Sequence, residues 1–256
     1  MSADVGVILA AVRDEQGTGA VVGTARSLGV ATGHAWGVVR TASAGAALRA
    51  LHRPGVVALV VATGPASTGT APLGLRIRTL VERARKPVVL VPPGVDPPDA
   101  IRRVLLPLEG TPDSSRPVVD ELVPLLPPTV RLQVLHVFTP ATLPRMLDRP
   151  VRDLEMLGRA FTARHCPPAH EVELHHGSVA ARVVEIASTG GVDLVALSWS
   201  QVSSGERARV VRSVLASSPV PVVLLPVARV ASGGERPKGP TGRHRSGPMV
   251  TTARRS

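Results

Sequence analysis

Two pairs of segments in this 256-residue chain repeat one pattern, an apolar run and then a proline-led apolar run. Residues 55–62 (GVVALVVA) align with 191–198 (GVDLVALS), and residues 87–91 (PVVLV) align with 221–225 (PVVLL). The members of each pair are separated by nearly the same number of residues. A period this long indicates two copies of one domain rather than a solenoid, whose repeats span roughly 20–50 residues.

Each copy alternates expected strands with expected helices. In the first copy the apolar patterns predict strands at 5–12, 34–41, 56–62 and 88–91, with helices at 20–28, after the cap Ser43, and at 75–84. In the second they predict strands at 101–108, 130–138, 171–176, 192–198 and 220–225, with helices capped by Thr111 or Ser114, at 145–165, at 179–188 after Ser178, and at 207–216. This alternation predicts an α/β fold of two tandem doubly wound, mostly parallel sheets.

The first copy lacks one strand–helix unit and is therefore the shorter one. The proline-rich segment 92–98 predicts a stiff, exposed spacer between the copies. We expect domains at 1–94 and 99–227, followed by a tail at 228–256.

The tail holds more than half of the net charge of +11, is rich in Gly, Pro, Ser and Arg, and is expected to be disordered. A basic tail can hold nucleic acid weakly, but an aromatic content of 2% offers little for stacking bases, so a solvated terminus is the favoured interpretation. The single Cys166 excludes an intramolecular disulfide. No signal peptide and no membrane span is expected, and the cytoplasm is the expected location.

The second copy resembles the universal stress protein family, and hence a fold of the adenine-nucleotide α-hydrolase type. The resemblance is carried by these landmarks: 105–111 (LLPLEGT), Ser114, His136-Val137, Gly177, 193–198 (DLVALS) and 219–224 (PVPVVL). The first copy resembles the family from about Ser43 to Val91. In this family the last strands often pair antiparallel between partners, so the resemblance implies an internal pseudo-dimer in which Val88 to Val91 pairs with Val222 to Leu225.

Universal stress proteins that bind ATP resemble one another in a loop Gly-x-x-Gly, nine residues, Gly-Ser/Thr, where glycines let backbone N–H groups face phosphate oxygens. In the second copy those positions read Ser198, Gln201, Ala208 and Arg209, and the loop is shorter. Glu109 stands where ATP-binding members carry Asp. The resemblance therefore implies weakened or lost ATP binding in the second copy, although Arg209 could attract an anion by charge.

The first copy departs less from this loop. Thr63 and Gly64 follow the strand and Gly74 stands at the later glycine position, but Leu75 replaces the hydroxyl residue. Glycines are equally what a flexible loop uses. If ATP or AMP binds anywhere, we expect it here.

Two other sequence patterns resemble binding sites, but the residues around each argue against it. Gly17-Thr18-Gly19 with Gly23 imitates a dinucleotide fingerprint, but four polar residues separate it from the strand and Arg40 stands where an acid is needed. His165, Cys166, His170, His175 and His176 include potential zinc ligands, but adjacent strand residues point to opposite faces, so no metal site is expected.

Three functions remain open. The favoured one is a stress-response regulatory binding protein with reduced nucleotide affinity; the alternatives are an adenine-nucleotide module using Gly64 to Gly74 and a protein-interaction scaffold, with itself or another protein as partner. No motif of acyl transfer, P-loop hydrolysis or zincin chemistry occurs, so no dedicated catalysis is expected and a weak ATPase ranks last.

Overall fold

The computed structural model describes residues 5–13, 18–64, 74–110, 112–138, 154–199 and 205–227. Its first half contains β1 (Val7–Val12), α1 (Thr18–Thr32), β2 (Ala35–Arg40), α2 (Ala44–Leu51), β3 (Val56–Ala62), α3 (Leu75–Arg83) and β4 (Val88–Val91). Its second half contains β5 (Arg103–Pro107), α4 (Pro112–Leu122), a 3-10 turn (Val123–Leu125), β6 (Arg131–Phe138), α5 (Leu154–His165), β7 (Glu171–His176), α6 (Val179–Thr189), β8 (Leu194–Trp199), α7 (Glu206–Ser217) and β9 (Val222–Pro226).

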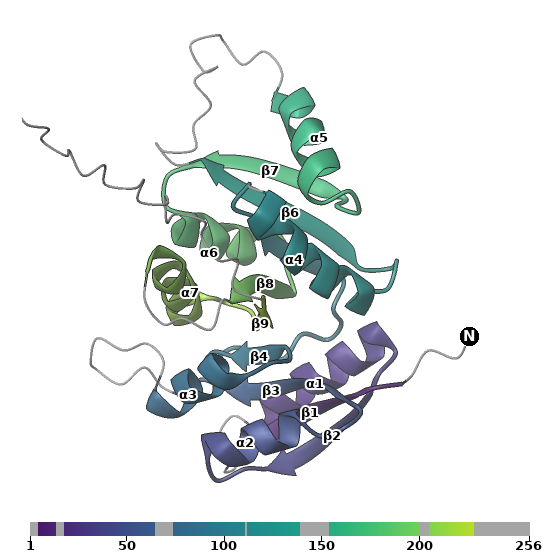
Figure 1. Ribbon diagram of the computed structural model, residues 1–256, viewed down its shortest axis with the longest axis vertical. Helices are drawn as coiled ribbons and strands as arrows, with labels where there is room; N and C mark the ends of the chain where they lie inside the picture. Colours follow the sequence, from purple (N-terminus) through teal and green to yellow (C-terminus); the bar gives the residue numbers. More distant parts are fainter. Residues whose placement is uncertain are drawn as a thin grey trace, which may run out of the picture.

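The strands form one nine-stranded sheet in the order β2-β1-β3-β4-β9-β8-β5-β6-β7, which runs the length of the molecule (Figure 1). Every neighbouring pair is parallel except β4 and β9. The expectation of two tandem sheets is therefore corrected to one continuous sheet, because β4 and β9, the strands whose pairing the family resemblance implied, share antiparallel hydrogen bonds.

That antiparallel junction pairs Val88 with Leu224, Val89 with Val223 and Leu90 with Val222. Val91 and Leu225 lie in the same two strands but outside the paired register. The β-branched residues at this junction suit a strand that is buried on both faces. The junction leaves neither β4 nor β9 as a sheet edge.

The two halves share a strand order. The order β2-β1-β3-β4 of the first half corresponds to β6-β5-β8-β9 of the second, which adds β7 at its outer side. The strand–helix unit of the second half that has no counterpart among the described residues of the first half is α5 with β7. The first half was expected to be shorter by one such unit.

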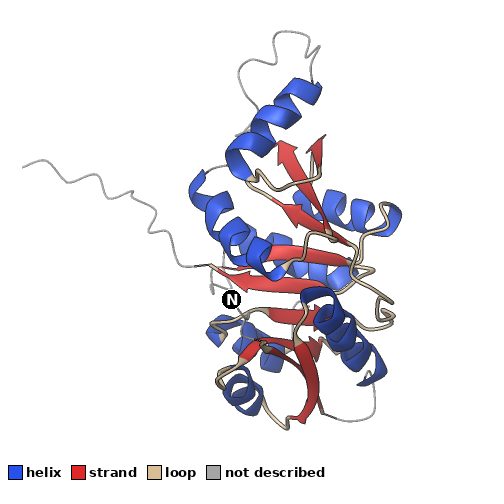
Figure 2. Ribbon diagram, turned by 90° about the vertical axis from the view of Figure 1, so that its right-hand side faces the viewer, coloured by secondary structure: helices blue, strands red, loops and turns tan. Residues whose placement is uncertain are grey.

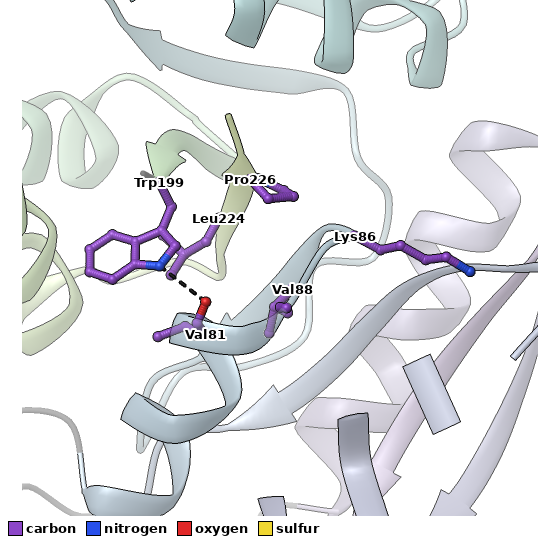
Figure 3. Close-up of a pocket in the computed structure, with 7 residues that line it drawn as sticks. Val81, Lys86, Val88, Trp199, Leu224 and Pro226 are labelled. Carbon is purple, nitrogen blue, oxygen red and sulfur yellow. Dashed lines mark hydrogen bonds between the residues drawn. The ribbon is translucent and has the colours of Figure 1, made fainter. Parts of the chain in front are cut away.

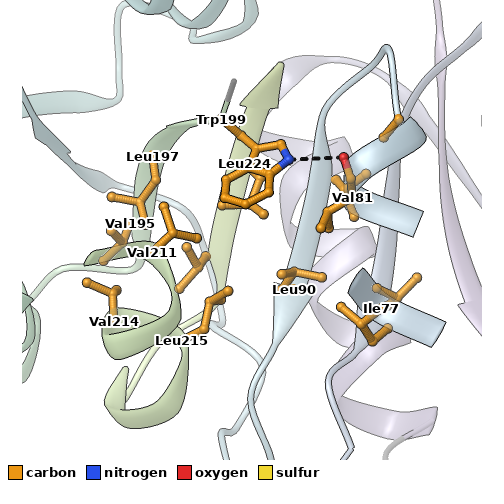
Figure 4. Packing of buried hydrophobic residues seen from close by; sticks show 14 of the residues in the cluster. Ile77, Val81, Leu90, Val195, Leu197, Trp199, Val211, Val214, Leu215 and Leu224 are labelled. Carbon is orange, nitrogen blue, oxygen red and sulfur yellow. Dashed lines mark hydrogen bonds between the residues drawn. The ribbon is translucent and has the colours of Figure 1, made fainter. Parts of the chain in front are cut away.

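Helices cover both faces of the sheet, because successive residues of each strand point to opposite sides (Figure 2). On one face α1, α4 and α5 pack over residues such as Ile8, Val60 and Leu106. On the other, α2, α3, α6 and α7 pack over residues such as Leu59, Leu90 and Leu224. Figure 4 shows how α3 and α7 meet this second layer beside the β4–β9 junction.

Several helix starts agree with the sequence. Ser43 accepts a hydrogen bond from Ala46 N and Ser178 accepts one from Ala181 N, so α2 and α6 carry the expected N-caps. Helix α4 begins at Pro112, which puts Ser114 inside the helix, and Thr111 lies outside the described residues.

The connection between the halves is not a free spacer. Ser27 of α1 is buried and donates its hydroxyl to the Pro98 backbone oxygen, and a Cβ on Gly23 would collide with Pro97. The end of the proline-rich segment, at Pro97 and Pro98, therefore packs against α1, whereas Pro93, Gly94 and Asp96 are exposed, so the expected exposed spacer is only partly so. The expected tail at 228–256 lies outside the described residues.

Candidate functional site

Open parallel sheets bind ligands at the carboxyl ends of strands where the strand order reverses. In this molecule the reversals lie between β1 and β3 and between β5 and β8. Because β4 and β9 are antiparallel, the carboxyl ends of the two halves lie at opposite edges of the sheet. The chain therefore has two separate candidate sites.

In the first half, Thr63 and Gly64 follow β3 at the carboxyl edge. Thr63 is buried, and both its amide and its hydroxyl are directed at the Val91 backbone oxygen, at 3.0 and 3.4 Å. Gly64 is exposed with φ of 66°, a left-handed conformation that favours glycine. The Thr63 hydroxyl is thus bonded within the sheet, and Gly64 is the residue open to solvent.

Gly74 is the N-cap of α3, and a glycine at this position has no side chain of its own to cap the helix start. Leu75 is the first helical residue. A Cβ added to Gly74 would meet nothing within 4 Å, so the space beside it is open. The loop joining Gly64 to Gly74 lies outside the described residues.

Three arginines of the described chain lie at this edge, and the sequence patterns gave none of them a role in anion binding. Among described residues, Arg13 follows β1, Arg40 ends β2 and Arg76 lies in the first turn of α3. The Nη2 group of Arg76 donates to the Thr41 backbone oxygen at 2.6 Å and to Thr41 Oγ1 at 3.2 Å. A positive charge in the first turn of a helix is unfavourable, because it lies beside the positive end of the helix dipole. Arg76 at such a position was therefore a sequence signal that this residue has another role. The edge combines positive charge with an uncapped helix start and can therefore accept an anion.

In the second half, Glu109 and Gly110 follow β5. Glu109 is exposed, and Gly110 has φ of 80°. The preceding Leu108 oxygen lies 2.9 Å from Nδ1 of the buried His136, which stands near the carboxyl end of β6. A Cβ on Gly110 would lie 2.6 Å from His136 Cε1, so the turn and the imidazole are packed tightly.

His136 belongs to a ring cluster formed by β6, β7 and α5. Its ring stacks on Phe161 at 4.6 Å and meets Phe138 edge-on at 4.7 Å. Phe161 contacts His165 at 4.6 Å, and Phe138 contacts His176 at 5.5 Å. Burial lowers the pKa of His136, and burial with the nearby Arg164 lowers the pKa of His165. The buried members His136 and His165 are therefore held toward their uncharged forms, whereas His176 lies at the exposed end of the cluster.

The other candidate metal ligands have separate partners. His170 Nδ1 accepts from Leu132 N at 3.2 Å, and His175 Nε2 lies 2.7 Å from Glu173 Oε2. Cys166 is fully buried, which raises the pKa of its thiol to about 11 and leaves it protonated. No group of three or more His, Cys, Asp or Glu in the described ranges could hold a metal ion.

The connection from β8 to α7 differs from its first-half counterpart. It spans residues 200–205, half the length of residues 63–74 between β3 and α3. The structure places Gly205, with φ of 92°, at the N-cap of α7, and again no side chain caps the helix. Ala208 instead lies in the helix, 1% exposed, within the core. Gly205 was missed because the spacing of the longer loop was applied to a shortened one.

The remaining candidates of this loop are dispersed. Ser198 lies in β8 and Arg209 is exposed on α7, while Gln201 lies outside the described residues. Trp199, at the end of β8, is 3% exposed and donates its indole N–H to the Val81 oxygen of α3 at 3.1 Å. Figure 3 shows the indole reaching across the junction between the halves.

Two hollows stand out among the described residues, and neither contains a predicted site residue. The first, beside Trp199, Lys86 and Leu224, is too narrow for a water molecule (Figure 3). The second, of about 250 Å³, opens between α5 and the start of β7 and is lined by residues including Arg159, His170 and Glu171.

Comparison with known proteins places the second half in a family. Residues 100–226 match the model of the Universal stress protein family. A functionally unknown protein from Pseudomonas aeruginosa PAO1 is similar in structure at 14% identity, with a TM-score of 0.57 over 86% of this chain and 82% of that one. A universal stress protein from Archaeoglobus fulgidus DSM 4304 is similar at 13% identity, with a TM-score of 0.55 over 87% of this chain and 96% of that one.

These structural matches establish the fold, and their coverage extends it to both halves of the chain. No curated protein matches the sequence. Within the described ranges, none of the helices combines the length and apolar character needed to cross a bilayer.

Proposed function

The chain carries a universal stress protein domain at residues 100–226, and from this premise we propose that it is a stress-response binding or regulatory protein of the cytoplasm whose second half has weakened or lost ATP binding. The observation that carries the proposal is the β8–α7 connection. It is half as long as the β3–α3 connection and begins after an indole that is fixed to the opposite half. A loop this short has little backbone left to wrap a triphosphate.

Shared helix starts support the origin of both halves from one domain. Helices α2 and α6 are capped by serines, whereas α3 and α7 begin at the uncapped glycines Gly74 and Gly205. Agreement in both strand order and capping favours duplication, with the α5–β7 unit lost from the first half.

A second candidate function is adenine-nucleotide binding at the first carboxyl edge. Gly64 supplies an exposed backbone, Gly74 supplies an N-cap without a side chain, and Arg76 supplies positive charge in the first turn of α3. The third candidate, a protein-interaction scaffold, requires no nucleotide at either edge.

Calorimetric titration with ATP and magnesium, and with AMP, separates these candidates. A first-edge site predicts saturable heat that is lost in Gly74→Asp, because the new carboxylate occupies the N–H groups and repels phosphate. The same substitution adds an N-cap in open space and should raise the melting temperature, so lost binding would not come from unfolding.

The same titration also tests the carboxyl edge of the second half. Arg209→Ala should leave any measured heat unchanged, because we propose that this edge no longer binds ATP. Heat that disappears in Arg209→Ala and persists in Gly74→Asp would contradict the proposal. A flat titration of the unmodified protein would exclude the nucleotide module and favour the scaffold.

A further inference from the structure

The outer strand of the first half, β2, presents an apolar edge. The side chains of Trp36, Val38 and Arg40 in this strand are exposed, Trp36 by 41% and Val38 by 52%. Among the described residues, strand β2 ends the sheet, with β1 as its one neighbour in the strand order. Figure 1 places β2 at one end of the molecule and β7 near the other. Exposed edge strands of this kind pair readily with another chain.

The same positions are covered in the second half. Ile8 pairs with Trp36 and Ala10 with Val38, as Val104 pairs with Leu132 and Leu106 with Val134. Leu132 is 3% exposed and Val134 is fully buried, because β7 and α5 lie over this side of β6. The described part of the first half, residues 5–13, 18–64 and 74–91, contains no counterpart of β7 and α5. Its β2 therefore keeps a surface that the fold elsewhere covers with a further strand.

We propose that this surface binds a second copy of the chain, with β2 pairing antiparallel to β2 of the partner around a two-fold axis at Val38. The backbone orientation fits this register. Ala35 N and Thr41 N donate toward β1, to the oxygens of Gly6 and Val12. Since alternate residues face opposite sides, the N–H and C=O groups of Trp36, Val38 and Arg40 face the open edge.

The side chains are self-complementary in that register. Val38 meets Val38 of the partner subunit at the axis, and Trp36 meets Arg40 of the partner subunit on both sides of it. An arginine over an indole is a favourable cation–π pair, and the Val pair buries apolar surface. No like charges oppose each other. This symmetric fit favours a second copy over an unrelated extended peptide, and the chain already extends its own sheet by antiparallel pairing at β4 and β9.

Sedimentation equilibrium of the full chain tests the proposal at tens of micromolar. The unmodified protein should have twice the mass of the 26.6 kDa chain. Val38→Lys should be monomeric, since it brings two ammonium groups together at the axis. Met156→Lys serves as the matched control, because Met156 is 63% exposed on α5, far along the chain from β2, and its replacement should leave the dimer intact.

Two substitutions of Trp36 test the register itself. Both remove the same indole, but Trp36→Glu faces Arg40 of the partner subunit with an opposite charge and Trp36→Lys faces it with a like charge. The dimer dissociation constant should be about tenfold larger for Trp36→Lys than for Trp36→Glu. A monomeric unmodified protein, dissociation constants that are equal for the two variants, or a monomeric Met156→Lys would each overturn the proposal. Circular dichroism melts establish that every variant is folded, and neither ATP nor AMP is needed.

Discussion

Trp199 connects the two halves through one buried hydrogen bond. Its indole N–H satisfies the Val81 oxygen, one of the last carbonyls of α3, which the ended helix cannot pair internally. Trp199→Phe keeps most of the ring but leaves this buried oxygen without the donor, at a cost of about 1–3 kcal/mol. Urea unfolding followed by circular dichroism measures the change.

The second tryptophan provides the control for this prediction. Trp36 is 41% exposed in the single chain, so Trp36→Phe should change the free energy of unfolding by much less at protein concentrations where the chain is monomeric. Equal losses in the two variants would show that the bond to Val81 contributes little.

Cys166 is the single thiol of the chain, and its chemistry is set by burial. A pKa of about 11 leaves very little thiolate at neutral pH, and the side chain is not exposed. We expect Ellman's reagent at pH 8 to modify the native protein orders of magnitude more slowly than the urea-unfolded chain. Rapid labelling of the native protein would mean that α5 opens readily.

Gly110 shows how a turn after a strand depends on its neighbour. Gly110→Ala adds a Cβ where φ is 80° and the His136 ring lies 2.6 Å away, so both the backbone and the packing oppose it. We expect a loss of more than about 1 kcal/mol, with a lower melting temperature. Gly45→Ala in α2 adds the same methyl group in loose surroundings and should stabilise the protein by up to about 1 kcal/mol. A stable Gly110→Ala variant would show that the ring moves aside easily.

At the level of strands and helices, the sequence patterns located most of the elements because apolar runs with β-branched residues have few alternatives. The patterns at Ser43 and Ser178 also identified two N-caps, since a hydroxyl before a helical run has a local partner. The expected helix 207–216 agrees with α7 to within one residue, but its N-cap Gly205 was not identified, because the position of that glycine depends on the length of a loop that no local pattern encodes. The role of Arg76 was missed because its partner, Thr41, is distant in sequence.

Viewed as one molecule, the chain joins its two halves at β4 and β9, the two strands whose antiparallel pairing the family resemblance implied. The repeat alone indicated two copies and did not show that their sheets would be continuous. Hydrogen bonds between β4 and β9 convert two expected sheets into one, and the indole of Trp199 adds a side-chain bond across the same junction. The exposed edge of the first half is therefore β2. Because this half lacks a counterpart of the α5–β7 unit among its described residues, apolar side chains of β2 are left exposed.

The ring cluster around His136 should make the stability of the whole protein sensitive to pH. The pKa values of His136 and His165 both lie below the ordinary 6.5, chiefly because burial disfavours the charged imidazole. The unfolded chain therefore binds more protons than the folded one below about pH 6.5. Stability is fully present above that pH and is lost as the pH falls toward the folded pKa values.

Thermal melts between pH 5 and 8 should therefore show a constant melting temperature above about pH 7 and a progressive decline below 6.5. His165→Phe keeps a ring against Phe161 but cannot be protonated, so its decline should be shallower. His52→Gln, at an exposed position after α2, should follow the unmodified protein. A decline that is equally steep in His165→Phe would assign the acid sensitivity to groups other than His165, since the substitution removes its titration while keeping its ring contact with Phe161.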